Sequence, residues 1–384
     1  MDKEEDILKT DPFKEYIMQT EPSKRDKGYA WQTAIGLQAV DGLRPSEYLI
    51  ATAINNIEGR IDIDEAQQLL DQYYRENPAA LDNNRTEEAD KVSARIAKLL
   101  SEKAFSFTPN QYMAIHKDLF RGIYKHAGQI RTYNITKKEW VLDGSTVLYG
   151  PASELRAALE YDLSQEKSFT YKGLSMDETI HHLAVFVSRL WQIHVFAEGN
   201  TRTTAVFFIK YLRTLGFDVT NDIFAENAWY FRNALVRANY NDLKNGIHET
   251  TEFLEMFLRN LLLGEKNELH NRTMHISGKF ESNKKQDIGL LKQDIEPEKQ
   301  DIGISTLYAE NLEGLSRKTI NNIEKIYREF FNKEYFGRTD IVNLLGITPS
   351  PASELIKKML DRHIICTVDG HGKGKYRFCN TGDN

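Results

Sequence analysis

A short polar turn between two apolar helical segments constrains this chain more than any other feature of its sequence. Upstream of the turn, apolar residues recur over positions 180–191 at the three- and four-residue spacing that aligns them on one helical face. Downstream, the same spacing runs over positions 206–212 and stops before Gly216, a residue type that often follows the last turn of a helix. The sequence therefore predicts a tight helix-loop-helix connection over residues 194–202.

The turn carries side chains and backbone groups that suit a phosphate and a metal ion. The amides from Asn200 to Thr203 lie where a helix begins, and there the unpaired N–H groups and the helix dipole favour an anion. Glu198 offers a hard oxygen ligand for Mg²⁺ shared with phosphate oxygens, and Arg202 can neutralise a phosphate chain. His194 can accept the proton of an attacking hydroxyl, and Phe196 is expected to point inward as an anchor. The stretch therefore combines a base, a metal ligand and a phosphate cradle.

These residues resemble the signature of the Fic family, His-x-Phe-x-Asp/Glu-Gly-Asn-Gly-Arg-x-x-Arg. Members of that family transfer a nucleoside monophosphate, usually AMP from ATP, to a Ser, Thr or Tyr hydroxyl of a protein target. The resemblance implies that His194 is the general base and that Glu198 binds Mg²⁺. The nucleotide-binding positions that it implies are Gly199, Asn200, Thr201 and Arg202. Of these, the first two belong to the anion hole for the α-phosphate, and the last contacts the β-phosphate.

Two positions depart from the signature. Thr201 replaces the second Gly and adds a side chain where the backbone usually meets phosphate. Ala205 replaces the final Arg, which in relatives helps to hold the γ-phosphate and pairs with an inhibitory Glu. We expect a protein adenylyltransferase that uses ATP and Mg²⁺. The alternatives are a transferase of this fold with another nucleotide donor or phosphoryl group, and a DNA-binding regulator whose domain senses nucleotide or is inactive. Taken singly, His194 and Glu198 would be an ordinary helix-end histidine and a solvated charge, but the whole set in register favours a site.

The segments before the signature extend the resemblance. Residues 115–120 and 127–131 resemble the helix and loop that precede the Fic flap. Residues 140–149 then predict two short strands that turn at Asp143 and Gly144, a dipeptide common in hairpins. In the family this hairpin pairs with the backbone of the target through main-chain hydrogen bonds. An ordinary covering hairpin is the alternative.

A weaker match lies near the start of the chain. A helix near residues 47–59 ends in Glu58 and Gly59, which match the second half of the Ser/Thr-x-x-x-Glu-Gly/Asn sequence of an inhibitory helix. Ile54 takes the Ser/Thr position, and Ala205 removes the Arg with which this Glu usually pairs. Glu58 is therefore a candidate regulatory residue, and an exposed helix-end Glu is the equal alternative.

Length and composition predict several mainly helical domains. A chain of 384 residues is too long for one ordinary core, and 41% hydrophobic with 28% charged residues is typical of a soluble protein. Three Lys-Gln-Asp-Ile repeats, too few and too polar for a coiled coil, indicate a linker. We predict an N-terminal helical region at 1–100, a Fic-like catalytic core with its hairpin flap at 101–264, a polar linker at 265–303 and a C-terminal unit at 304–384.

The C-terminal unit has the element order of a winged helix. The expected elements are helices at 316–331, 338–346 and 350–360 and strands at 364–368 and 375–378. The third helix begins with Ser350 as its cap and a Pro in its first turn. Such a domain places that helix in the major groove of DNA while basic side chains contact phosphate. The candidate contacts are Lys357, Lys358, Arg362, Lys373, Lys375 and Arg377. Protein docking or homodimer formation is the alternative use.

Several features limit location and partners. The chain has no basic, apolar leader at its Met1 end and no run of eighteen apolar residues, so we expect a cytoplasmic protein without a membrane partner. Cys366 and Cys379 give neither a disulfide framework nor metal-ligand spacing. A net charge of -6 argues against strong overall affinity for nucleic acid. The expected partners are ATP, a protein with an acceptor hydroxyl, and DNA at the C-terminal unit.

Overall fold

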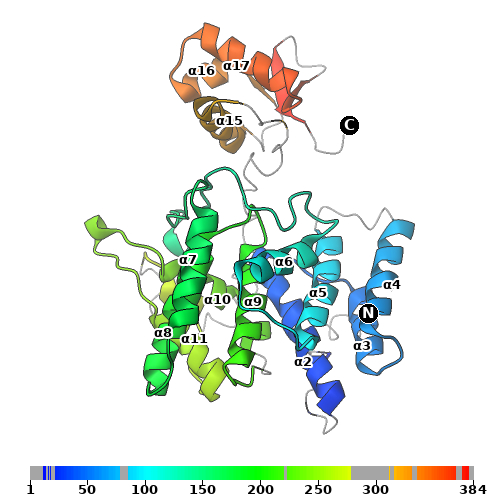
Figure 1. Ribbon diagram of the computed structural model, residues 1–384. Helices are drawn as coiled ribbons and strands as arrows, with labels where there is room; N and C mark the ends of the chain where they lie inside the picture. Colours follow the sequence, from blue (N-terminus) through cyan, green and yellow to red (C-terminus); the bar gives the residue numbers. More distant parts are fainter. Residues whose placement is uncertain are drawn as a thin grey trace, which may run out of the picture. The chain divides into compact units, whose positions relative to one another are not determined.

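The computed structural model shows a mainly helical chain (Figure 1). It describes residues 12–13, 16, 18, 22–77, 85–219, 223–277, 311, 315–330, 335–368 and 374–379. The chain divides into two compact units, residues 1–298 and 299–384. The three Lys-Gln-Asp-Ile repeats of the predicted linker lie outside the described residues.

The first unit consists of helices and short helical turns around one hydrophobic core. Its elements in chain order are α2 Pro22–Gly36, η2 Leu37–Asp41, α3 Glu47–Ile57, α4 Ile63–Glu76, α5 Thr86–Ser101, α6 Pro109–Phe120, η4 Trp140–Leu142, α7 Leu155–Ser168, α8 Met176–Ile193, α9 Asn200–Thr214, α10 Ile223–Arg237, η5 Leu243–Asn245, α11 Glu252–Leu263 and η6 Asn271–Met274.

The two helices that the apolar spacing predicts are α8 and α9. A capping box starts α8: the Ser175 hydroxyl accepts the Glu178 N–H at 3.2 Å, and the Glu178 carboxylate accepts the Ser175 N–H at 2.8 Å. The predicted inner face of α8 is buried and consists of Ile180, Leu183, Val187, Leu190 and Trp191. α9 is buried on every side over residues 200–212 because it packs against α5, α6 and α8 (Figure 1). The loop between α8 and α9 is therefore anchored at both ends in the core.

The predicted two-stranded flap is wrong in its secondary structure. Residues 140–142 form a short helical turn, and neither arm of the segment 136–149 is a strand. The turn itself lies where the sequence places it, with positive φ at Asp143 and Gly144 and a bond from Glu139 N–H to the Ser145 carbonyl at 2.9 Å. Consecutive side chains of a strand point to opposite faces, whereas Val141 and its neighbour Leu142 are both fully buried. A helical turn can bury both, and a strand of a one-sided flap cannot.

The first unit includes residues that the sequence assigns to the linker. η6 lies at residues 271–274, and its Met274 is buried in the core of this unit. The Ile276 N–H donates to the Val141 carbonyl at 3.0 Å. Residues 265–277 therefore pack on the first unit, beyond the predicted end of the catalytic core at 264.

The second unit has a separate core and a small sheet. Its elements in chain order are α15 Arg317–Phe330, β1 Phe336–Gly337, α16 Arg338–Leu345, α17 Pro349–Asp361, β2 Ile365–Thr367 and β3 Lys375–Phe378. The antiparallel sheet has the order β1-β3-β2, with Phe336 opposite Tyr376 and Cys366 opposite Arg377. Residues 369–373, between the two predicted strands, lie outside the described residues.

The start of α17 differs from the prediction. Thr348 is its N-cap and Pro349 its first residue, so Ser350 lies inside the first turn and does not cap the helix. Pro is favoured at a first helical position because its fixed φ suits the helix and the missing N–H has no partner there. Two prolines stand two residues apart, and the helix begins at the earlier one. In the described part of the chain, no helix is long and apolar enough to span a membrane.

Candidate active site

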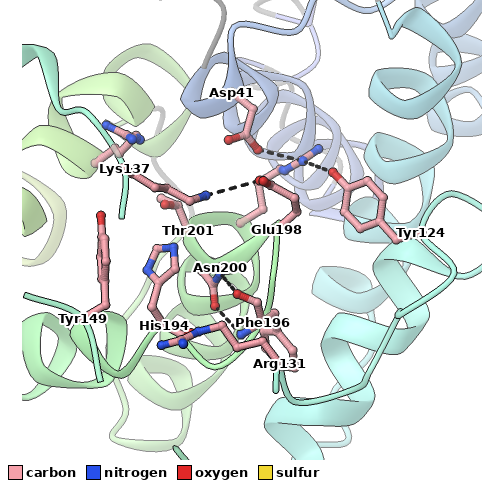
Figure 2. A network of polar contacts seen from close by, with 12 residues as sticks. Asp41, Tyr124, Arg131, Lys137, Tyr149, His194, Phe196, Glu198, Asn200 and Thr201 are labelled. Carbon is pink, nitrogen blue, oxygen red and sulfur yellow. Dashed lines mark hydrogen bonds and ion pairs between the residues drawn. The ribbon is translucent and has the colours of Figure 1, made fainter. Parts of the chain in front are cut away.

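The loop between α8 and α9 reverses the chain through two left-handed residues. His194 ends α8 with φ 51° and ψ 58°, and its N–H donates to the Trp191 carbonyl at 3.0 Å. Gly199 precedes α9 with φ 72°. A positive φ is uncommon for a residue with a side chain, and at a histidine it calls for a structural cause. The conformation holds the His194 ring beside the start of α9 (Figure 2).

Gly199 is required at its position for two reasons. Its left-handed backbone disfavours any side chain, and a Cβ built there would lie 2.3 Å from the Phe120 ring. Phe120 is the last residue of α6, so the contact presses that helix against the loop. The contact therefore fixes the loop against α6 at the point where α9 begins.

Asn200 closes the loop with its side chain. Its Oδ1 accepts the Phe196 N–H at 2.9 Å, and its Nδ2 donates to the Phe196 carbonyl at 2.7 Å (Figure 2). Phe196 is fully buried, as the sequence predicts, and stacks on the His116 ring with centroids 3.7 Å apart. These two bonds use the side-chain oxygen of Asn200 and one of its two side-chain N–H donors.

Thr201, the first departure from the signature, bonds to α8 through its side chain. Its hydroxyl accepts the indole N–H of Trp191 at 3.0 Å, and both side chains are buried. A buried indole N–H needs an acceptor, and a Gly at position 201 could not supply one. The added side chain is thus accounted for by the packing of α8 on α9, and the backbone amide of Thr201 stays in the first turn of α9.

His194 is buried but has no hydrogen-bond partner among the described residues at either ring nitrogen. Only 3% of the residue is exposed, and its ring lies 4.3 Å from that of Tyr149. Burial, with the positive charges of Lys137 and Arg131, holds the pKa of His194 well below its ordinary value. The ring is therefore neutral at neutral pH, which is the state that can accept a proton.

Glu198 projects beside the base and pairs with a cation. Its Oε2 lies 3.3 Å from the Lys137 ammonium (Figure 2), and its main-chain carbonyl accepts the Nε2–H of His116 at 3.0 Å. The described residues contain no cluster of three acidic, His or Cys ligands. Mg²⁺ does not need one, because it is commonly held by one or two carboxylates together with substrate phosphates. Glu198 therefore fits a shared Mg²⁺ site of that kind.

Arg202 is fully buried and bonded to acidic side chains. Its Nη2 lies 2.7 Å from both Asp41 and Glu88, and its Nη1 donates to Gln38 at 2.9 Å. Burial would raise the pKa of Asp41, but Arg202 together with Arg85 holds it below its ordinary value. These bonds hold η2 and α5 against the start of α9. The resemblance implies that Arg202 contacts the β-phosphate. That contact stays a prediction, because the guanidinium is already paired with two carboxylates.

The proposed regulatory Glu58 lies elsewhere. It follows α3, and its carboxylate bonds to Lys24 of α2 at 3.2 Å. A hydrogen bond from Tyr16, with that of Lys24, lowers the pKa of Glu58. Ala205 is fully buried in α9, so no cation extends from that position. The structure does not bring Glu58 together with Arg202.

Two residues of the site have no signal in the sequence motif. Lys137 is one of them. The other is Arg131, which lies beside His194 (Figure 2), and its Nε donates to the His194 carbonyl at 2.7 Å while its Nη2 donates to the Gly150 carbonyl at 2.5 Å. Arg131 was visible in the sequence only as the end of a loop pattern. Its role as a clamp on the carbonyls around His194 required the fold.

A buried ion pair supports the aromatic side of the site. Glu139 accepts the Tyr149 hydroxyl at 2.8 Å and lies 2.6 Å from Arg232 of α10. The positive charge of Arg232 also contributes to the lowered pKa of His194, after burial and closer cations. The ring beside His194 is therefore fixed by a charged pair that the motif does not contain.

The domain around this loop matches a known family. Residues 106–212, which include α6 to α8, the loop and most of α9, match the model of the Fic/DOC family. No curated protein matches the chain.

Proposed function

We propose that this chain, in which residues 106–212 form a Fic/DOC family domain, transfers AMP from ATP to a Ser, Thr or Tyr hydroxyl of a protein target. The observation that carries the proposal is the placement of His194 at the end of α8, beside the start of α9, with no hydrogen-bond partner among the described residues at either ring nitrogen. A buried neutral imidazole with an open nitrogen is poised to accept a proton from a hydroxyl.

The reaction assigns a role to each part of the loop. The acceptor hydroxyl loses its proton to His194 as its oxygen attacks the α-phosphorus, a new P–O bond forms, and the bond to pyrophosphate breaks. The first backbone hydrogen bond of α9 runs from the Thr203 N–H to the Gly199 carbonyl at 3.0 Å. The N–H groups of residues 200–202 therefore come before the first hydrogen bond of the helix. These N–H groups, at the positive end of the helix, are placed to stabilise the charge on the α-phosphate. Glu198 would hold Mg²⁺, which neutralises phosphate charge when bound.

Substitution of His194 tests the reaction. His194→Ala should lower transfer by about 10²- to 10⁴-fold, because one general base is removed. Incubation with ATP, GTP, CTP and UTP, followed by intact-mass measurement of the chain and of candidate targets, identifies the group that is moved. An increase equal to AMP supports the proposal, while other masses support another donor or phosphoryl group. Nucleotide binding without any covalent label supports the sensor alternative, and labelling by the substituted chain at the parent rate refutes the role of His194.

We infer a second function, DNA binding, for the second unit. Its element order of one helix, one strand, two helices and two strands supports the winged-helix fold that we propose for it. α17 buries Leu355, Ile356 and Met359 and exposes Lys357 and Lys358, so the helix presents cations on the face that its core does not use. This arrangement favours contact with phosphate.

Salt dependence tests DNA binding in the full chain. Replacement of Lys357 and Lys358 by Ala should weaken binding to duplex DNA and flatten its salt slope by up to about two units, because each phosphate contact contributes nearly one. His194→Ala should leave that slope unchanged. Absence of duplex binding by the parent chain at low salt would refute the inference and favour protein docking or dimerisation.

A further inference from the structure

One cation joins the segment before α7 to the acidic residue of the loop. Lys137 belongs to the extended chain that leads to η4, and its backbone N–H donates to the Thr146 hydroxyl at 3.2 Å. Its ammonium lies 3.3 Å from Glu198 Oε2, between the start of α9 and Asp41 (Figure 2). The two side chains of the pair are 18% and 14% exposed, so solvent and ligands can reach them.

The other cations near the loop are already engaged. Arg202 is fully buried between Asp41 and Glu88, and Arg232 is buried against Glu139. Their N–O distances are 2.6 to 2.7 Å, which is the range of strong charge-assisted bonds. The contact of Lys137 is longer and more exposed than these, so it costs less to break.

The charge of Lys137 reaches both sides of the site. After burial, it is the largest of the positive charges that lower the pKa of His194. It also lowers the pKa of Asp41, after burial, Arg202 and Arg85. A charge that affects both His194 and Asp41 lies close to the space between these two residues. Because position 205 is Ala, the first two turns of α9, residues 200–206, carry no cation besides Arg202.

We propose that Lys137 binds the terminal phosphates of the donor nucleotide and closes on Glu198 when the nucleotide is absent. The inference rests on the proposed function, because it assumes that the loop binds a nucleotide. In the closed state the ammonium neutralises Glu198, and on nucleotide binding it exchanges that carboxylate for phosphate oxygens. The flexible stem of a lysine and its three donors suit such an exchange. Lys137 would thus supply, from the chain before η4, the charge that Ala205 does not.

A series of nucleotides that differ only in phosphate number tests the proposal. Binding of AMP, ADP and the non-hydrolysable ATP analogue AMP-CPP is measured by calorimetry with Mg²⁺ for the parent, Lys137→Met and Lys137→Arg. Lys138→Met is the matched control, because its side chain is exposed and one residue away. Lys137→Met should weaken the binding of ADP and AMP-CPP by about 10- to 100-fold, which is the range for a hydrogen bond to a charged group. The affinity for AMP should stay within about twofold of the parent. Lys137→Arg should retain most of the preference for longer phosphate chains, and Lys138→Met should match the parent.

A second measurement needs no nucleotide. Since Lys137 neutralises Glu198 in the closed state, Lys137→Met should bind Mn²⁺ alone several-fold more tightly than the parent, as followed by electron paramagnetic resonance. Equal weakening of the binding of AMP, ADP and AMP-CPP would mean that Lys137 only supports the fold. Unchanged affinities for all three nucleotides would mean that Lys137 does not contact phosphate. Either result overturns this inference while the proposed function stands. A parent chain that binds no nucleotide overturns both.

Discussion

The close approach of Gly199 to Phe120 makes a quantitative prediction about stability. Gly199→Ala adds a methyl group 2.3 Å from a ring carbon of Phe120, at a residue with φ 72°. The left-handed backbone alone costs a residue with a side chain about 1 to 2 kcal/mol, and forcing an extra methyl group into a packed core costs about 1 to 3 kcal/mol. We therefore expect the free energy of unfolding to fall by about 2 to 5 kcal/mol.

Gly216 at the other end of α9 provides a matched control. It also has a positive φ, of 89°, but nothing lies within 4 Å of the place that a Cβ would take, so Gly216→Ala should cost only the backbone strain of about 1 to 2 kcal/mol. The difference between the two variants isolates the contact with Phe120. Adding Phe120→Leu should recover part of the loss in Gly199→Ala but none in Gly216→Ala.

Urea unfolding followed by tryptophan fluorescence measures these losses in the first unit. All 4 tryptophans of the chain lie in residues 1–298, so the signal reports this unit. Equal destabilisation by Gly199→Ala and Gly216→Ala would refute the reasoning, because the loop would then have room for a methyl group. Failure of Phe120→Leu to relieve Gly199→Ala would place the strain elsewhere.

Three further predictions concern hydrogen bonding, pH and regulation. Thr201→Val should lower the free energy of unfolding by about 1 to 3 kcal/mol, since the Trp191 N–H loses its acceptor, while Thr201→Ser should keep most of it in the same urea assay. Burial lowers the pKa of His116 to about 3, against 6.5 in the unfolded chain. The free energy of unfolding therefore does not depend on this group above pH 6.5, and it falls by about 1.4 kcal/mol per pH unit below that value. His116→Asn should remove that slope from unfolding curves measured between pH 6.5 and 5. Glu58→Gly should raise self-labelling with radioactive ATP only slightly because Glu58 pairs with Lys24, and strong activation would contradict this.

The sequence predicts the part of the site that depends on local spacing. The helices α8 and α9 follow from their apolar periodicity, and the tight turn between them follows from where that periodicity stops. The buried position of Phe196 follows in the same way. Each of these depends on residues within about two helical turns.

The remainder depends on contacts between distant segments. Two of the partners of Arg202 are Gln38 and Glu88, which are 164 and 114 residues away along the chain, and no motif joins them to it. The flap prediction was wrong because Val141 and Leu142 are both drawn into a core that includes residues from the far end of the unit. The bond between the Thr201 hydroxyl and Trp191 became apparent only once α8 and α9 were packed together.

The ring of hydrogen bonds between Asn200 and Phe196 determines how the loop would respond to a ligand. Two backbone groups and one side-chain amide are already ordered there, and the stack of Phe196 on His116 holds them from below. A ligand that binds to this loop has little conformational entropy to remove from it, so more of the interaction energy remains as affinity. The conformational entropy that binding still removes is that of the ligand and of the long exposed side chains around the loop. The loop is therefore preorganised, and the rate of ligand binding depends on the groups around it that still move.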